Sequence, residues 1–211
     1  MTKKTEERLS DEHKESVIAQ FLDLHLYPKL KSVKTQRIIE KTLQVQGVDI
    51  TMLCKDILKY IDEKAATDNK YLDGSLQRFC VEITTLNRKG ELMEGWFANM
   101  TLLTTHYLFV WIREVKDGKL TCVDDIKKIE VCLVPKSKIY EYLLKKGWTR
   151  ERLLEKAHNI RYNGDREFFE DGLKFYFAEH KDEKPIGATI PINVYKRLAD
   201  FHYTVTPDFI Y

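Results

Sequence analysis

The sequence has few of the features that mark secreted, membrane-bound or zinc-stabilised proteins. Its 211 residues include only 4 cysteines and 5 prolines. The cysteines lie far apart with no C-x-x-C pair, which argues against a zinc knuckle and a disulfide framework. The longest strongly apolar run, Tyr107 to Ile112, is far shorter than the roughly 20 residues that span a membrane. The first residues have no apolar core typical of a secretory signal. We therefore expect free thiols, a cytoplasmic location and no membrane partner.

An excess of charge of one sign is also missing. Lysine and arginine number 35 against 33 aspartates and glutamates, giving a formal net charge of +2. Bulk charge therefore does not indicate nucleic-acid binding, and any basic surface must be local. The sequence contains neither a G-x-x-x-x-G-K-[ST] phosphate loop nor an H-E-x-x-H motif. These absences give no support to an ATP-driven activity and argue against a zinc hydrolase.

The residues that are present predict a folded protein with helices around a β-rich centre. The sequence is 43% hydrophobic and 32% charged, which is typical of a globular domain. We expect a single α/β or α+β domain over 1–211, with a core over about 10–135 and helices and a hairpin over 136–211. Apolar spacing predicts a first helix from an N-cap at Ser10 to His25. We interpret 29–41 as a basic connecting stretch and 195–201 as a short closing helix.

The most informative segment is a predicted β-hairpin. Residues 48–53 and 57–62 read as strands joined by a tight turn at Lys55 and Asp56. In that register Asp49 faces Asp62 across the hairpin, with Cβ atoms roughly 4.5–5.5 Å apart. Side chains alternate along a strand, so Lys64 shares the face of Asp62 and Glu63 points away. Two carboxylates and one ammonium are thus expected to converge at the far end of the hairpin.

Two facing carboxylates repel each other unless a positive charge lies between them. A hard cation such as Mg²⁺ or Mn²⁺ is the natural occupant, and it would polarise a phosphate and lower the pKa of a bound water. An acid two residues before a lysine is by itself a weak signal, since Glu114-Val115-Lys116 has the same spacing. The alternative is a polar rim on an exposed hairpin, without chemistry.

The spacing of Asp49 followed by Asp62-Glu63-Lys64 resembles the signature of the PD-(D/E)XK nuclease superfamily. In that superfamily an acid on one strand and an acid-x-lysine on the next strand build a metal site. The resemblance covers roughly 10–115, with Val48 where the name-giving proline stands and Asp62 in place of the commoner glutamate. It implies a restriction-endonuclease-like fold, with a central mixed β-sheet flanked by helices. It also implies metal-dependent cleavage of nucleic acid, most often DNA.

The resemblance extends the predicted site to further residues. Superfamily members often add a carboxylate from an N-terminal helix, and Glu15 is the candidate because it shares a helical stripe with Ile18 and Leu22. The alternative is a surface glutamate. The backbone carbonyl of Glu63 is the further metal ligand expected under this hypothesis. The predicted phosphate contacts lie in the basic stretch, where the alternative is a solvated face: Lys31, Lys34, Arg37 and Lys41.

The leading hypothesis is a Mg²⁺-dependent endo- or exonuclease acting on DNA, in which Asp49 and Asp62 hold the metal and Lys64 assists the attacking water. Duplex cleavage by folds of this size often needs two copies, so a homodimer is among the expected assemblies. A second hypothesis is a nucleic-acid-binding or assembly protein that keeps the fold without the activity. A third is a structural interaction module that uses the apolar strand at 107–112.

Overall fold

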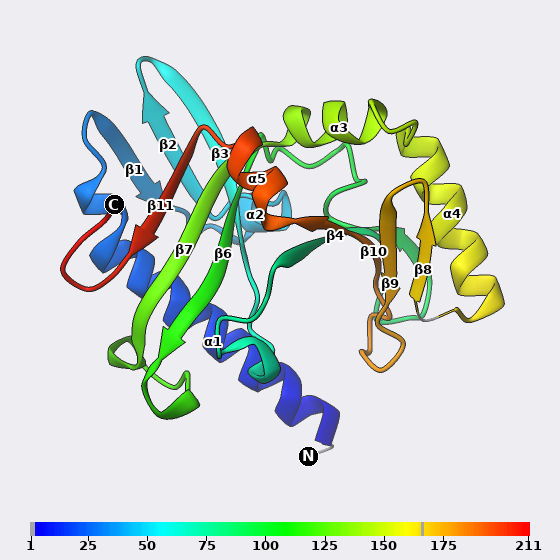
Figure 1. The fold of residues 1–211 in the computed structure, drawn as a ribbon, viewed down its shortest axis with the longest axis horizontal. Helices are drawn as coiled ribbons and strands as arrows, with labels where there is room; N and C mark the ends of the chain where they lie inside the picture. The colour runs from blue at the N-terminus through cyan, green and yellow to red at the C-terminus, as the bar shows by residue number, and fades with distance from the viewer. Residues whose placement is uncertain (1–2, 166) are drawn as a thin grey trace. The chain divides into compact units, whose positions relative to one another are not determined.

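The computed structural model describes residues 3–165 and 167–211. It is an α+β protein whose chain divides into two compact units (Figure 1). Unit 1 comprises Met1–Gln77, Leu103–Pro135 and Ala199–Tyr211, and unit 2 comprises Arg78–Leu102 and Lys136–Leu198. The chain therefore leaves unit 1 and returns to it twice. The expectation of one domain over 1–211 stays a prediction.

Unit 1 is built on a mixed six-stranded sheet with the order β1-β2-β3-β6-β7-β11. Only β3 and β6 run parallel, and the other neighbouring pairs are antiparallel. The strands are β1 Val33–Arg37, β2 Ile50–Cys54, β3 Ile57–Ala65, β6 His106–Val115, β7 Ile126–Pro135 and β11 Phe201–Val205. The parallel pair places the end of β3 beside a central strand of the sheet, where side chains are buried.

Helix α1 (Lys3–His25) runs across one face of this sheet and buries an apolar stripe against it (Figure 1). Val17, Ile18, Phe21 and Leu22 are at most 3% exposed. The spacing of these residues correctly predicted the helix and its end at His25. The predicted N-cap at Ser10 is wrong, because the helix already begins at Lys3.

The stretch 29–41 is not a simple connection, as the sequence had suggested. It contains the last residue of a short 3-10 helix (Tyr27–Lys29), strand β1, and the first residue of helix α2 (Lys41–Val45). Along β1 half-buried and exposed residues alternate, which is the pattern of a strand with one face inward. The lysines on the exposed face hid this alternation, because they made the segment look uniformly polar.

Unit 2 holds a five-stranded antiparallel sheet with the order β5-β4-β10-β9-β8. The strands are β4 Arg78–Leu86, β5 Leu92–Glu94, β8 Glu167–Glu170, β9 Leu173–Phe177 and β10 Ile186–Pro191. The helices are α3 Lys136–Leu144, α4 Arg150–Asn163 and α5 Ile192–Leu198. The β9–β10 hairpin confirms the hairpin expected within 136–211. Thr149 is the N-cap of α4, and its side chain accepts a hydrogen bond from the Arg152 N–H. The predicted helix at 195–201 was placed too late in the chain, because α5 ends at Leu198 and β11 begins at Phe201.

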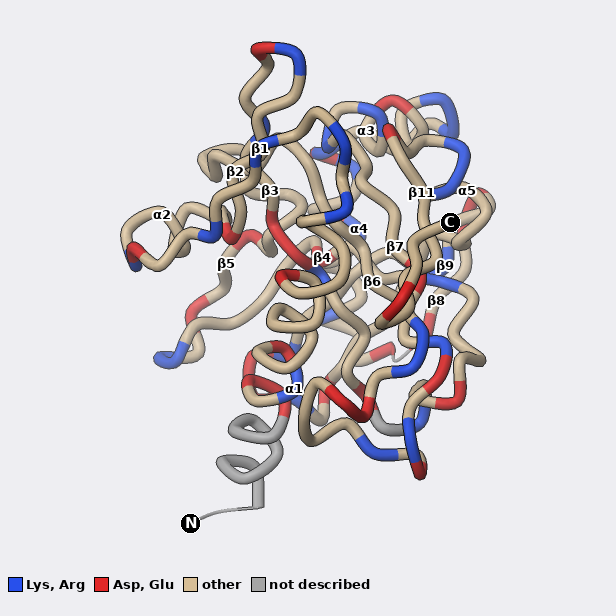
Figure 2. Tube along the Cα trace, turned by 90° about the vertical axis from the view of Figure 1, so that its left-hand side faces the viewer, with Lys and Arg blue, Asp and Glu red and all other residues tan. Residues whose placement is uncertain are grey.

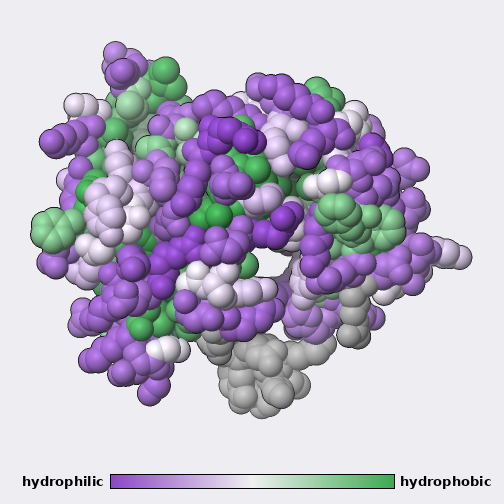
Figure 3. All heavy atoms as spheres, viewed as in Figure 1, coloured by the Kyte–Doolittle hydropathy of each residue, from purple (hydrophilic) through white to green (hydrophobic). Residues whose placement is uncertain are grey.

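The surface is mostly charged, and its apolar exceptions are local. Lysines and arginines follow β1 and the β2–β3 turn in Figure 2. The upper left of Figure 3, where that hairpin ends in Figure 1, shows hydrophobic side chains beside hydrophilic ones. Leu53, Ile57 and Leu58 are exposed there. In contrast, Tyr107 to Ile112 are at most 2% exposed, which rules out the predicted use of this strand as an interaction surface. No helix among the described residues is long and apolar enough to cross a membrane.

Candidate metal and catalytic site

The β2–β3 hairpin has the register that the sequence predicted. Cys54 pairs with Ile57, and Ile50 pairs with Ile61. The turn residues Lys55 and Asp56 both have positive φ, at 48° and 63°, as a two-residue hairpin turn requires. The residue numbers of each cross-strand pair therefore sum to 111. This register brings the residues just before β2 next to the end of β3.

Asp49 stands immediately before β2 and binds β3 through both its backbone and its side chain. Its N–H donates to the Ile61 carbonyl at 2.8 Å. Its carboxylate Oδ2 accepts a hydrogen bond from the Glu63 N–H, also at 2.8 Å. Because the N–H and C=O of a strand residue point toward the same neighbour, the Glu63 carbonyl also faces the Asp49 side. The Asp49 carboxylate and the Glu63 carbonyl thus lie on the same side of β3, the side that faces β2.

Asp62 and Lys64 form an ion pair, with Lys64 Nζ 2.7 Å from Asp62 Oδ1. The Asp62 side chain is 5% exposed and the Lys64 side chain 25%. The pKa of Asp62 is raised to about 7: burial is the largest cause, Asp49 adds to it by charge repulsion and hydrogen bonding, and Lys64 opposes it. Burial lowers the pKa of Lys64, but attraction by Asp62, Asp49 and Glu15 outweighs it, so this pKa is raised. Asp49, Asp62 and Lys64 are therefore one electrostatic group.

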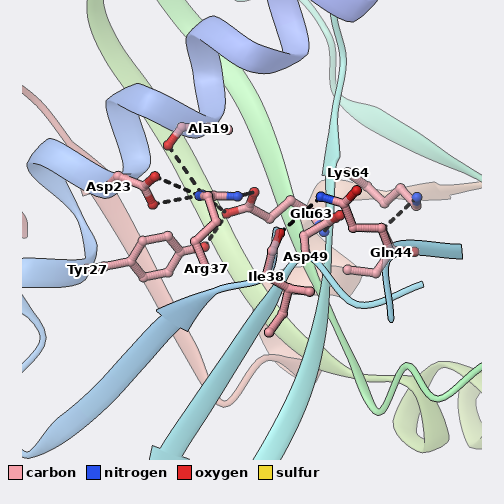
Figure 4. Close-up of polar contacts among 10 residues, drawn as sticks. Ala19, Asp23, Tyr27, Arg37, Ile38, Gln44, Asp49, Glu63 and Lys64 are labelled. Atoms are coloured by element: carbon pink, nitrogen blue, oxygen red, sulfur yellow. Dashed lines mark hydrogen bonds and ion pairs between the residues drawn. The ribbon is translucent and has the colours of Figure 1, made fainter. Parts of the chain in front are cut away.

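Glu63 points to the opposite face of the sheet, where it joins a separate polar network (Figure 4). Arg37 Nη1 donates to Glu63 Oε2 at 2.8 Å, and the Tyr27 hydroxyl donates to Glu63 Oε1. The other side of the Arg37 guanidinium binds Asp23, with Nε 2.6 Å from Oδ2 and Nη2 2.8 Å from Oδ1. Arg37 also donates to the Ala19 carbonyl at 3.3 Å.

This network occupies the Arg37 guanidinium with protein partners, and its predicted contact with nucleic-acid phosphates stays a prediction. Its guanidinium already binds two carboxylates, and those contacts raise its pKa although burial opposes the charge. Burial also raises the pKa of Glu63 and of Tyr27. The ion pairs fasten α1, β1 and β3 together. Sequence reasoning missed Asp23 and Tyr27, although Arg37 follows Val33 and Thr35 at the period of a strand's inner face.

Glu15 does not face the core, in contrast to the helical stripe predicted for it. Its side chain is exposed, and Lys14 is buried instead, with Nζ donating to the Thr67 carbonyl at 3.2 Å. Lys14 precedes Ile18 by four residues, which places it more centrally on the buried stripe. Glu15 is nevertheless close enough to raise the pKa of Lys64 by electrostatic attraction. It therefore belongs to the solvent-facing surroundings of the site.

The remaining basic candidates differ from Arg37. Lys31, Lys34 and Lys41 are exposed, and in the part of the chain that the structure describes they form no ion pair. In the described part of the chain the rival acid-x-lysine segment forms no comparable cluster, and Glu114 makes an exposed ion pair with Lys128 at 3.4 Å. The hairpin is therefore the better of the two candidates.

The donor set suits a small cation that keeps much of its water. Mg²⁺ is commonly bound through one or two carboxylates together with water and substrate phosphates. Asp49 and Asp62 supply two carboxylates. Burial is the main cause of the raised pKa of Asp62, and a cation between the two would relieve the repulsion by Asp49 that adds to it. Among the side chains that the structure describes, no group of three or more His, Cys, Asp or Glu is arranged to hold a metal ion. Any metal here would therefore depend on the two carboxylates, backbone oxygen and water.

Comparison with known proteins gives no match to a protein-family model, to a curated protein or to a solved structure. The resemblance to the PD-(D/E)XK superfamily therefore rests on the hairpin and its three charged side chains.

Proposed function

We propose that this protein is a metal-dependent nuclease of the PD-(D/E)XK type, with a restriction-endonuclease-like fold around the β2–β3 hairpin. It would hydrolyse phosphodiester bonds, with DNA as the expected substrate. The observation that carries the proposal is the convergence of Asp49, Asp62 and Lys64 on neighbouring strands, with Asp62 buried and its pKa raised to about 7. Strongly perturbed carboxylates of this kind concentrate at functional sites.

The residues of this chain have distinct roles in the proposal. Asp49 and Asp62 would hold Mg²⁺, and the Glu63 carbonyl lies on the same edge of β3 as the Asp49 contact. The bound cation would supply Lewis-acid polarisation of the phosphate. Lys64 favours the ionised form of Asp62 through a direct ion pair, and its ammonium would orient the attacking water or offset developing negative charge. Glu63 itself lies on the opposite face with Arg37, so its carboxylate has no part in the chemistry.

A second candidate function is nucleic-acid binding without cleavage on the same fold. The observation in its favour is that, among the described side chains, no third potential metal ligand lies beside the carboxylates of Asp49 and Asp62. In an inactive protein no metal would bind, and the ion pair with Lys64 would be the only compensation for the Asp62 charge. The two functions differ in whether a divalent cation binds at the hairpin and whether cleavage follows.

Cleavage assays separate these functions. The full chain is incubated with plasmid, linear duplex, single-stranded DNA and RNA in the presence of Mg²⁺, Mn²⁺ or EDTA. We expect metal-dependent cleavage that falls on the order of a hundredfold or more in Asp62→Asn. Asp117→Asn is the matched control, because Asp117 lies in the turn after β6 with a φ of 53° that asparagine tolerates. Cleavage that Asp62→Asn leaves intact would place the active site elsewhere, and binding without cleavage would favour the second function.

A further inference from the structure

The face of the sheet that carries Asp62 and Lys64 continues along the hairpin as an open surface. Cross-strand partners lie on the same face of a sheet. Lys34 pairs with Leu53, and Leu53 pairs with Leu58. Gln36 pairs with Thr51, and Thr51 pairs with Tyr60. Asp62 follows Tyr60 by two residues, so it belongs to the same face. We call the six residues Lys34, Gln36, Thr51, Leu53, Leu58 and Tyr60 the hairpin platform.

The hairpin platform is accessible, unlike the opposite face, which packs under α1. Leu53 is 37% exposed and Leu58 48%. Lys34 and Gln36 are exposed, and Thr51 and Tyr60 are half-buried. Among the described residues the Tyr60 ring has no aromatic neighbour and its hydroxyl has no hydrogen bond. An aromatic ring and two leucines are thus presented to solvent beside the candidate catalytic site.

The backbone of Tyr60 is held by hydrogen bonds, although its ring has no partner among the described residues. Its backbone N–H donates to the Thr105 hydroxyl oxygen at 2.9 Å, and its carbonyl accepts from the Thr105 N–H at 2.9 Å. These bonds fix the strand from the β6 side, and β2 fixes it from the other side. Because the backbone of Tyr60 is already fixed, stacking of a planar ligand on its ring costs little backbone entropy.

We propose that the hairpin platform binds an unpaired segment of a nucleic-acid strand and leads it into the Asp49–Asp62–Lys64 site. This inference rests on the proposed function and specifies its substrate. A single strand exposes the faces of its bases, which stack on aromatic rings and apolar surface, whereas a duplex presents mainly phosphates. The platform offers one ring and two leucines but only one lysine, so it matches bases better than it matches a duplex backbone.

The charges around the platform fit the phosphates of that strand. Lys31 and Lys55 are exposed beside it, and Asp56 is the neighbouring acid at the turn. Lys34 stands on the platform itself, opposite Leu53. Asp62 follows Leu58 by four residues along the strand, a path of roughly 13 Å. A strand lying along this path would reach the carboxylates with its bases on Tyr60 and its phosphates near the lysines.

Binding in EDTA tests the inference independently of cleavage. Fluorescence anisotropy is measured with the full chain and labelled 12-mers of oligothymidylate, oligouridylate and a blunt DNA duplex. Both single strands are used because stacking is common to DNA and RNA. We expect a single strand to bind at least tenfold more tightly than the duplex. Tyr60→Leu should weaken single-strand binding about tenfold or more, the size expected for one lost stacking contact.

Matched variants keep the test specific. Tyr60→Phe retains the ring and should bind within about twofold of the unmodified protein. Tyr162→Leu removes an exposed tyrosine of unit 2 and should change nothing. Lys34→Gln should reduce the slope of log affinity against log salt by about 0.7, as expected for one lost phosphate contact on a single strand. Lys119→Gln, an exposed lysine after β6, should leave the slope unchanged.

The outcomes separate this inference from the proposed function. Tyr60-dependent binding of either single strand supports the platform even when no substrate is cleaved, and in that case only the nuclease proposal fails. Equal binding of duplex and single strand with no effect of Tyr60→Leu overturns the platform, and cleavage of a duplex would then leave the nuclease proposal standing. The platform is also overturned if none of the three oligonucleotides binds up to about 100 μM, a weakness typical of nonspecific contact. Concentration-dependent self-association through Leu53 and Leu58 would overturn it as well.

Discussion

Replacing Lys64 with methionine tests whether Asp62 is ionised only because its partner is present. In the unmodified protein the pKa of Asp62 is about 7, against roughly 3.9 in an unfolded chain. The unfolded chain therefore releases this proton first as the pH rises. The contribution of Asp62 to stability falls between about pH 4 and pH 7 by up to roughly 4 kcal/mol, and above pH 7 it is constant.

Lys64→Met removes both the charge and the hydrogen bond that lower the pKa of Asp62, while burial and Asp49 remain. The pKa of Asp62 should therefore rise further, and the carboxyl should be neutral at pH 7. Because this neutral form is already about half populated at pH 7, the variant avoids the 3–5 kcal/mol that an unpaired buried charge usually costs. We expect a loss of about 1 kcal/mol at pH 7, the size of one hydrogen bond.

The pH dependence distinguishes this mechanism from a simple loss of packing. Between pH 7 and pH 9 the variant should keep losing stability relative to the unmodified protein, by up to about 2.7 kcal/mol. The pKa of Lys64 is raised above its usual value of 10.5, so its own titration does not enter this range. The assay is urea unfolding in EDTA at pH 5, 7 and 9, compared between the two proteins.

Lys128→Met provides the control. Its ion pair with Glu114 has a longer contact of 3.4 Å between exposed side chains. Its loss should cost less than about 1 kcal/mol, with no growth toward pH 9. A stability difference for Lys64→Met that is the same at pH 7 and pH 9 would show that Asp62 stays ionised without Lys64, and it would refute the buried-carboxylate reasoning. Mg²⁺ binding by Lys64→Met should also strengthen more steeply with pH, because the metal needs the ionised carboxylate.

Two further predictions concern structural contacts. Arg37→Met should lower the free energy of unfolding by about 3 kcal/mol, because Glu63 and Asp23 lose their shared cation. Lys34→Met, on the outer face of the same strand, should change the free energy of unfolding by less than about 0.5 kcal/mol. Equal effects of the two variants in urea unfolding would contradict the assignment of faces. Thr149→Ala should cost about 1 kcal/mol through loss of the α4 N-cap, and Thr149→Ser should restore it in thermal unfolding; a neutral alanine variant would show that the cap is dispensable.

The sequence by itself determined the local features of this protein. The extent of the apolar stripe on α1, the turn at Lys55 and Asp56, and the pairing of β2 with β3 all follow from short-range patterns. Such patterns depend on helical or strand periodicity and on turn chemistry within a few residues. The alignment of Asp49 with the end of β3 follows from that register, so these residues were identifiable without a structure.

Only the tertiary structure decided which charged side chains have an oppositely charged or hydrogen-bonding partner. Strand β1 looked like a basic connection because its lysines conceal the inward position of Arg37, and that position has meaning only beside Asp23 and Glu63. Likewise, Lys14 rather than Glu15 faces the core, because the orientation of α1 depends on the sheet beneath it.

The division into two units is also a property of the fold. Residues 78–102 join 136–198, and 199–211 return to pair β11 with β7 in unit 1. Pairings between residues far apart in sequence depend on burial and hydrogen bonding across the whole sheet, which no local pattern encodes. The raised pKa of Asp62 has the same origin, because burial by surrounding elements is its largest cause.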